Sequence, residues 1–153
     1  MYNFIYEKVN TIQEVEKLLS ENEETKILAG GQTLIPTMKQ RLASPSTLID
    51  ISGIDELNFI NDNGNSVTIG STVTHNEVSS SDIIMNKIPS LASLAEGIGD
   101  PHVRNMGTIG GSIANNDPTA DYPTACLSLN AKIKTNNREI NAEDFFIGLF
   151  ETA

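Results

Sequence analysis

The segment Gly107–Asp121 constrains this chain more than any other, because it carries almost no side-chain bulk. It reads Gly-Thr-Ile-Gly-Gly-Ser-Ile-Ala-Asn-Asn-Asp-Pro-Thr-Ala-Asp. Where Gly110 and Gly111 lack Cβ atoms, a ligand can lie against the main chain, and successive N–H groups can converge on an anion. The segment therefore predicts a place where backbone rather than side chains meets a ligand.

A second segment of this kind occurs earlier, where the apolar run Ile27–Ala29 ends in the pair Gly30-Gly31 and a helical pattern follows. One glycine pair alone is more often a plain turn between two elements. Two such pairs favour one long ligand bound by both. Neither segment contains the Gly-x-Gly-x-x-Gly fingerprint or the Gly-x-x-x-x-Gly-Lys phosphate loop, so the usual nucleotide-binding folds are not indicated.

Two longer motifs surround these glycine pairs, Leu28–Pro36 (Leu-Ala-Gly-Gly-Gln-Thr-Leu-Ile-Pro) and Asp100–Ala114 (Asp-Pro-His-Val-Arg-Asn-Met-Gly-Thr-Ile-Gly-Gly-Ser-Ile-Ala). Together they make the chain resemble the FAD-binding medium subunit of molybdenum hydroxylases, the family of xanthine, carbon monoxide and nicotinate dehydrogenases. The resemblance covers essentially the whole chain, with both motifs in the family's order and at its separation.

The resemblance implies that FAD lies extended between two lobes and that both glycine segments contact it. Gly30, Gly31 and Gln32 would present N–H groups to the pyrophosphate, Asp121 would accept hydrogen bonds from the ribityl or ribose chain, and Ile98 would lie beside the cofactor. The full predicted set is Ile27, Leu28, Ala29, Gly30, Gly31, Gln32, Thr33, Leu34, Ile98, Thr108, Ile109, Gly110, Gly111, Ser112 and Asp121.

The resemblance also implies partners. Electrons would leave a molybdopterin large subunit, pass through the [2Fe-2S] clusters of an iron–sulfur small subunit, reach FAD on this chain and leave for NAD or another acceptor. Since the redox chemistry belongs to the cofactor, we expect no catalytic side chain and no metal site here. Xanthine dehydrogenase is the favoured parent enzyme, with a carbon monoxide or nicotinate dehydrogenase flavin subunit as the alternative.

Family members continue for over a hundred residues into a C-terminal domain, which is absent from these 153 residues. A second alternative is therefore a truncated, non-catalytic docking module that keeps the fold but binds FAD weakly. Apolar residues near the end, Phe145–Phe150, are expected to need cover.

Charge and composition narrow the partners. Twenty acidic against ten basic residues give a net charge of −10, which argues against nucleic acid, because phosphate neutralisation needs clustered Lys and Arg. Cys126 is the single cysteine, so no disulfide or thiolate cluster can form within the chain. No signal segment and no long apolar stretch occurs, so we expect a cytoplasmic protein without a membrane span.

Residues 1–52 predict a small βαβαβ lobe with a parallel sheet. Strands are expected over 2–9, 26–29 (buried) and 47–51, with a helix after the capping box Thr11–Glu14 and another after an N-cap at Thr33.

Residues 53–153 predict a second lobe of helices and mostly antiparallel strands. Asn63-Gly64 is typical of a hairpin, and Thr74–Glu77 is a second capping box. The fold class is therefore α+β, a two-lobed FAD-binding domain.

Both histidines, His75 and His102, are interpreted as non-catalytic, with His102 in a loop and a change of His75 to alanine tolerated. Cys126 is interpreted as a core residue rather than a nucleophile.

Overall fold

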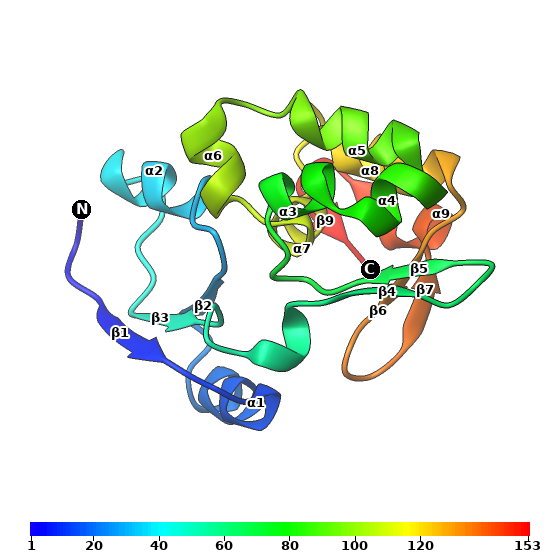
Figure 1. Cartoon of the computed structure of the whole chain (residues 1–153). Coiled ribbons are helices and arrows are strands. Elements are labelled where there is room, and N and C mark those ends of the chain that lie inside the picture. Colours follow the sequence, from blue (N-terminus) through cyan, green and yellow to red (C-terminus); the bar gives the residue numbers. More distant parts are fainter.

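A computed structural model describes all residues, 1–153, and shows two lobes side by side (Figure 1). The smaller lobe holds a three-stranded sheet between two helices. The larger lobe gathers its helices on one side of short antiparallel hairpins. This arrangement confirms the predicted α+β, two-lobed architecture.

The smaller lobe follows the predicted βαβαβ order. Its elements are β1 (Ile5–Lys8), α1 (Ile12–Glu21), β2 (Thr25–Leu28), α2 (Leu34–Lys39) and β3 (Thr47–Asp50). All three strands are parallel in the order β1-β3-β2, with Ile49 of β3 paired to Glu7 and Ile27. The core joins α1 to the central strand through Val9, Val15, Ile49, Ile51 and Ile54.

The prediction of a buried strand over 26–29 was wrong. In β2 only Thr25 is buried, and the side chain of Ile27 is 44% exposed. The physical reason is strand order, because the central position belongs to β3, whose Leu48, Ile49 and Asp50 are all buried. An apolar run alone does not tell an edge strand from a central one.

The larger lobe contains eight helical segments and three hairpins. Both predicted capping boxes are present, Thr11–Glu14 before α1 of the smaller lobe and Thr74–Glu77 before α3 of the larger lobe. Its elements are η1 (Asp55–Leu57), β4 (Ile60–Asp62), β5 (Val67–Ile69), α3 (His75–Ser80), α4 (Asp82–Lys87), α5 (Pro89–Glu96), α6 (Pro101–Met106), α7 (Ile109–Asn115), α8 (Asp121–Ser128), β6 (Lys132–Lys134), β7 (Glu139–Asn141), α9 (Ala142–Phe145), β8 (Phe146–Gly148) and β9 (Glu151–Thr152). Its core draws on α3, α4, α5, α7 and α8 and is centred on Val73, Val78, Ile84, Ala95 and Tyr122.

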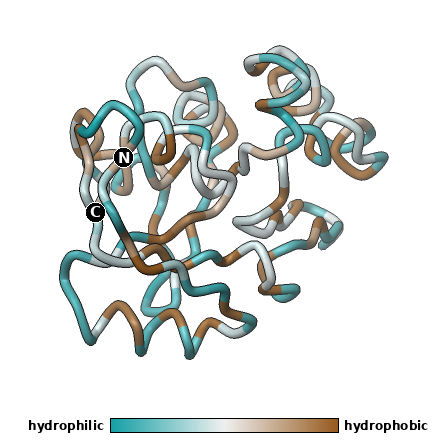
Figure 2. The backbone as a smooth tube through the Cα atoms, turned by 90° about the vertical axis from the view of Figure 1, so that its left-hand side faces the viewer, coloured by the Kyte–Doolittle hydropathy of each residue, from teal (hydrophilic) through white to brown (hydrophobic).

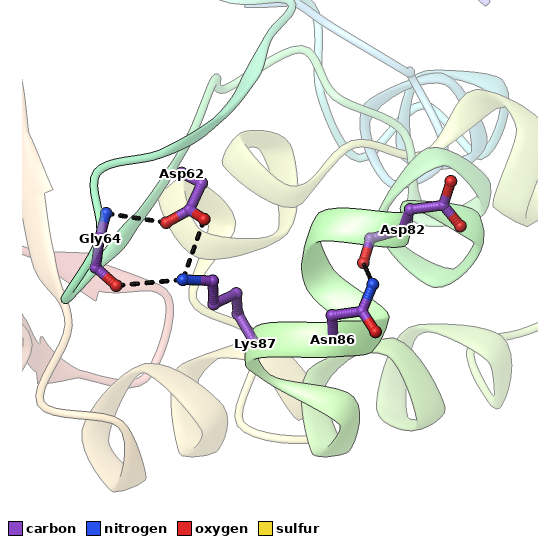
Figure 3. A network of polar contacts seen from close by, with 5 residues as sticks. All are labelled: Asp62, Gly64, Asp82, Asn86 and Lys87. Carbon is purple, nitrogen blue, oxygen red and sulfur yellow. Dashed lines mark hydrogen bonds and ion pairs between the residues drawn. The ribbon is translucent and has the colours of Figure 1, made fainter.

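The β4–β5 hairpin turns at the predicted Asn63-Gly64 and is tied to α4 by polar contacts (Figure 3). Lys87 Nζ lies 2.9 Å from Asp62 Oδ2 and also donates to the Gly64 carbonyl at 3.2 Å. The Gly64 N–H donates to the other oxygen of Asp62 at 2.8 Å. The hydrogen bond from Lys87 is the main cause that lowers the pKa of Asp62. Within α4, the Asn86 amide donates to the Asp82 carbonyl at 2.8 Å, as the same view shows.

Coloured by hydropathy, the chain shows short hydrophobic stretches interrupted by hydrophilic residues (Figure 2). None of its helices has the length and apolar character that a membrane crossing would require.

The last residues fold back onto α7. Asn116, which is buried and has a φ of 44°, donates from Nδ2 to the carbonyls of Gly148 (2.8 Å) and Glu151 (2.9 Å). Its own carbonyl accepts the Phe150 N–H at 3.0 Å. Phe145 is buried, whereas Leu149 and Phe150 remain 76% and 61% exposed. One asparagine therefore fixes the hairpin β8–β9 to the end of α7.

We expect Asn116→Ala to lower the free energy of unfolding by about 2 kcal/mol, because two hydrogen bonds to carbonyls are lost and alanine disfavours a left-handed backbone. Urea unfolding of the whole chain measures the change. Asn115→Ala is the matched control, since the Asn115 side chain makes no hydrogen bond. Equal stability of the two variants would contradict the role given to Asn116.

Candidate functional site

The loop between β2 and α2 leaves a run of backbone donors unused. None of the N–H groups from Ala29 to Leu34 donates to a carbonyl of the chain, and the first helical bond of α2 runs from the Ile35 N–H to the Gly31 carbonyl at 3.1 Å. The only side-chain contact within the loop is from Gln32 Nε2 to the Gly30 carbonyl, at 3.1 Å. Thr33 occupies the N-cap position, but its side chain makes no capping bond. Successive free N–H groups of this kind suit an anion.

Gly30 is needed for a contact between the lobes rather than for an approaching ligand. A Cβ placed on Gly30 would lie 1.9 Å from the Met106 carbonyl oxygen and 2.7 Å from Gly107 Cα. Those distances are far inside van der Waals contact, so any side chain at position 30 would push the loop away from the end of α6. The two glycine motifs therefore touch directly through their backbones.

The second segment, Thr108–Ser112, uses its N–H groups within the chain. Ile109 and Gly110 donate to the carbonyls of Val73 and Ser71, both at 3.0 Å. Thr108 caps α7 by accepting the Gly111 N–H on Oγ1 at 3.1 Å, and the Ser112 N–H returns to the Thr108 carbonyl. The expectation that this segment also offers converging N–H groups to an anion was wrong, because a helix begins there and Ser71–Val73 occupies its donors.

Gly110 is likewise packed against protein. A Cβ there would lie 2.5 Å from both Cβ and the carbonyl oxygen of Ser71. Gly111 faces the other way, toward the first loop, with its ideal Cβ position 3.8 Å from Ala29 Cβ. The second segment is thus a rigid wall beside the donor-rich loop.

A cavity of about 400 Å³ opens where these segments meet. Ala29, Gly30 and Ser52 line it from the first lobe, and Thr72, Asn76 and Thr108 line it from the second. Its one charged lining group, Glu77, already accepts hydrogen bonds from Thr74 through the capping box. A polar lining without a free cation suits a neutral group that makes hydrogen bonds.

Four polar residues of this lining were not predicted from the sequence: Ser52, Asn58, Thr72 and Asn76. Ser52, Asn58 and Thr72 lie in separate turns and caps and Asn76 lies in the first turn of α3, so no motif spacing marks them. The hydroxyl of Thr72 is buried without a hydrogen-bond partner.

Ile98 and Asp121 do not line the cavity. Ile98 follows α5, packs on the core of the larger lobe, and accepts a hydrogen bond from Arg104 Nη1 on its carbonyl at 3.1 Å. Asp121 begins α8, is exposed, and makes no side-chain hydrogen bond. Their contacts with a ligand stay predictions, as do those of the other members of the predicted set.

The structural positions of the two histidines differ from those expected. His102 lies on α6, not in a loop, because Asp100 caps a helix that starts at Pro101. His75 is only 6% exposed, and its ring lies beside Tyr122 with centroids 5.3 Å apart. A change of His75 to alanine would leave a buried cavity, so the expected tolerance does not follow.

Cys126 is a core residue, as predicted. It is buried on α8, and burial raises the pKa of its thiol to about 11. A thiol with so high a pKa is a poor nucleophile near neutral pH.

Comparison with known proteins identifies a family that matches nearly the whole chain. The family model described as "FAD binding domain in molybdopterin dehydrogenase" matches residues 2–153. The glyceraldehyde dehydrogenase medium chain of Sulfolobus acidocaldarius is 42% identical over 153 residues, covering 97% of this chain and 54% of the relative. The xanthine dehydrogenase FAD-binding subunit of Escherichia coli O157:H7 is 30% identical over 140 residues, covering 90% and 48%.

Among solved structures, carbon monoxide dehydrogenase from Hydrogenophaga pseudoflava superposes with a TM-score of 0.95 at 40% identity, covering 99% of this chain and 54% of that chain. The chain therefore spans about half the length of the relatives it matches.

Burial lowers the pKa of His75 in the folded chain, so the unfolded state binds a proton more readily. The contribution of neutral His75 to the free energy of unfolding is therefore complete above the unfolded-state pKa of about 6.5. This contribution is lost as the pH falls below that value and toward the lower pKa of the folded state. We expect the free energy of unfolding to fall between pH 7 and pH 5.5, because the unfolded chain takes up this proton first. Chemical denaturation at each pH measures this. The fall should vanish in His75→Phe and persist in His102→Ala, and an unchanged slope in His75→Phe would rule out His75 as the cause.

Proposed function

Because the chain belongs to the FAD-binding domain family of molybdopterin dehydrogenases, we propose that it holds FAD at the junction of its two lobes, as the flavin-bearing part of an oxidoreductase complex. Bound FAD would supply the redox chemistry. The chain's own residues bind the cofactor and orient it.

The run of free N–H groups from Ala29 to Leu34 is the observation that carries this proposal. FAD contains a pyrophosphate with two negative charges, and no lysine or arginine lines the adjoining cavity. Backbone N–H groups supply the needed donors in a chain whose net charge is −10. These residues fit the cofactor that the family's description names.

The other predicted residues have separate tasks under this proposal. Thr108–Ser112 forms the opposite wall, with Gly111 facing Ala29. The cavity beyond Gly30 would take a neutral, hydrogen-bonding part of FAD next to Ser52, Asn58 and Asn76. Asp121 and Ile98, on α8 and after α5, would contact the part of FAD that lies outside the cavity.

We propose the same complex as the family resemblance implies. A large subunit would carry molybdopterin, a small subunit would carry iron–sulfur clusters, and NAD or another acceptor would take the electrons. The names of relatives, such as "medium chain", support a multisubunit enzyme. A cytoplasmic location belongs to this proposal, with one buried, unpaired cysteine in its favour.

The parent enzyme need not act on xanthine, which sequence analysis favoured. Identity to the glyceraldehyde dehydrogenase medium chain exceeds identity to the xanthine dehydrogenase subunit. We therefore propose a parent enzyme of the glyceraldehyde or carbon monoxide dehydrogenase type ahead of the xanthine type. The rival function is a docking module without bound flavin.

A flavin-binding titration tests the proposal. We expect the purified chain to retain FAD through gel filtration, with a visible flavin spectrum, and to bind FMN far more weakly, because FMN lacks the pyrophosphate and adenosine. Equal binding of the two flavins would remove the donor-rich loop from the site. A colourless chain after saturation with FAD would favour the docking module.

Asp121→Asn should raise the dissociation constant of FAD about tenfold, since a hydrogen bond to a charged group is weakened. Fluorescence quenching of FAD measures the constant. Asp144→Asn is the control, because Asp144 is also exposed and is not among the residues predicted to contact FAD. If both variants bind FAD like the original chain, Asp121 does not contact the cofactor.

A further inference from the structure

The side chain of His75 has no hydrogen-bonding role within the chain, although it is almost fully buried. Its Nδ1 atom lacks a partner, and so does the hydroxyl of Tyr122, on which the ring packs. A buried polar group without a partner costs free energy, so its place calls for a reason other than a hydrogen bond inside the fold.

The ring lies directly against the second glycine motif. An ideal Cβ on Gly107 would be 2.5 Å from His75 Nε2 and 2.9 Å from Cδ2. The backbone is joined there as well, because the His75 N–H donates to the Gly107 carbonyl at 2.9 Å and Thr74 forms a bridge with Thr108. The imidazole ring thus packs directly against Gly107.

The backbone of Gly30 also lies close to Gly107, since an ideal Cβ on Gly30 would be only 2.7 Å from Gly107 Cα. Gly107 therefore connects His75, in the core of the larger lobe, with Gly30 in the donor-rich loop of the smaller one. The thickness of the His75 ring sets how far Gly107 stands from the core, and hence where the two motifs meet. In Figure 1 this junction lies where α3, α6 and α7 face the smaller lobe.

Tyr122 supports the ring from behind and is itself fully buried. It directly follows Asp121 at the start of α8. One packed pair of rings therefore connects the region of Thr108 with the first turn that carries Asp121.

We propose that His75 is a positioning residue for FAD: its ring acts as a spacer that holds Gly107 against Gly30 and so fixes the spacing of the two cofactor-binding segments. This inference rests on the proposed function for its ligand, but the spacing itself is a property of the chain without FAD. The volume and flatness of the ring carry the role, and its proton does not.

The test compares His75→Ala, His75→Phe and Ile84→Ala. Ile84 is a fully buried residue of the same core on α4, so its change to alanine controls for lost stability. Two quantities are measured, the dissociation constant and visible spectrum of bound FAD, and the amide hydrogen exchange of Ile109 and Gly110 without FAD.

We expect His75→Ala to weaken FAD binding by about tenfold or more, since misplacing a binding segment is costly, to alter the flavin spectrum, and to speed exchange at Ile109 and Gly110. His75→Phe should restore both quantities, and Ile84→Ala should change neither. His75→Val, a smaller loss of volume, serves if the alanine variant does not fold.

Two results would overturn the proposal. Equal effects of Ile84→Ala and His75→Ala at matched stability would show general destabilisation, and a His75→Phe variant as impaired as His75→Ala would show that the imidazole acts through a hydrogen bond. The exchange measurement stands without the cofactor. If the chain binds no FAD, the proposed function fails, and the spacer is still judged by exchange at Ile109 and Gly110.

Discussion

The contact between Gly30 and the backbone of Met106 and Gly107 is the constraint on which the rest of the site depends. It leaves no room for a side chain, with an ideal Cβ only 1.9 Å from a carbonyl oxygen. Because the lobes meet through backbone, the loop Ala29–Leu34 ends up facing the start of α7. The free donors of that loop and the cavity beside them lie at this approach.

The two glycine motifs look alike in sequence but differ in whether their backbone N–H groups are already hydrogen-bonded within the chain. The first supplies N–H groups that the fold leaves unpaired, whereas the second has its donors bound to Ser71, Val73 and Thr108. Under the proposed function, an anion would therefore be bound from one side, against a wall whose N–H groups are held within the chain. This division would let an acidic chain hold a doubly charged group without lysine or arginine, because a fixed N–H dipole attracts an anion.

Most features completed within a few residues were predictable from sequence, with two local exceptions: Thr33 makes no capping bond, and His102 lies on a helix that Asp100 caps. The capping boxes Thr11–Glu14 and Thr74–Glu77 and the turn at Asn63-Gly64 each depend on short-range geometry, and all three form as expected. The other errors concern partners that are distant along the chain. Ile27 is exposed because β3 takes the centre of the sheet, and the N–H groups of Ile109 and Gly110 are occupied by a segment nearly forty residues earlier.

The contacts of Gly107 likewise depend on residues that are distant along the chain. The sequence predicted ligand contact at Gly110-Gly111, because a pair of glycines is a recognisable motif and the single Gly107 is not. Gly107 lies close to His75 within its own lobe and to Gly30 across the junction. A Cβ on Gly107 would lie 2.5 Å from His75 Nε2 and 3.1 Å from the Val103 carbonyl oxygen, so a side chain there would have to displace a buried ring. The spacing of the motifs in space thus depends on a histidine that lies outside both of them in sequence.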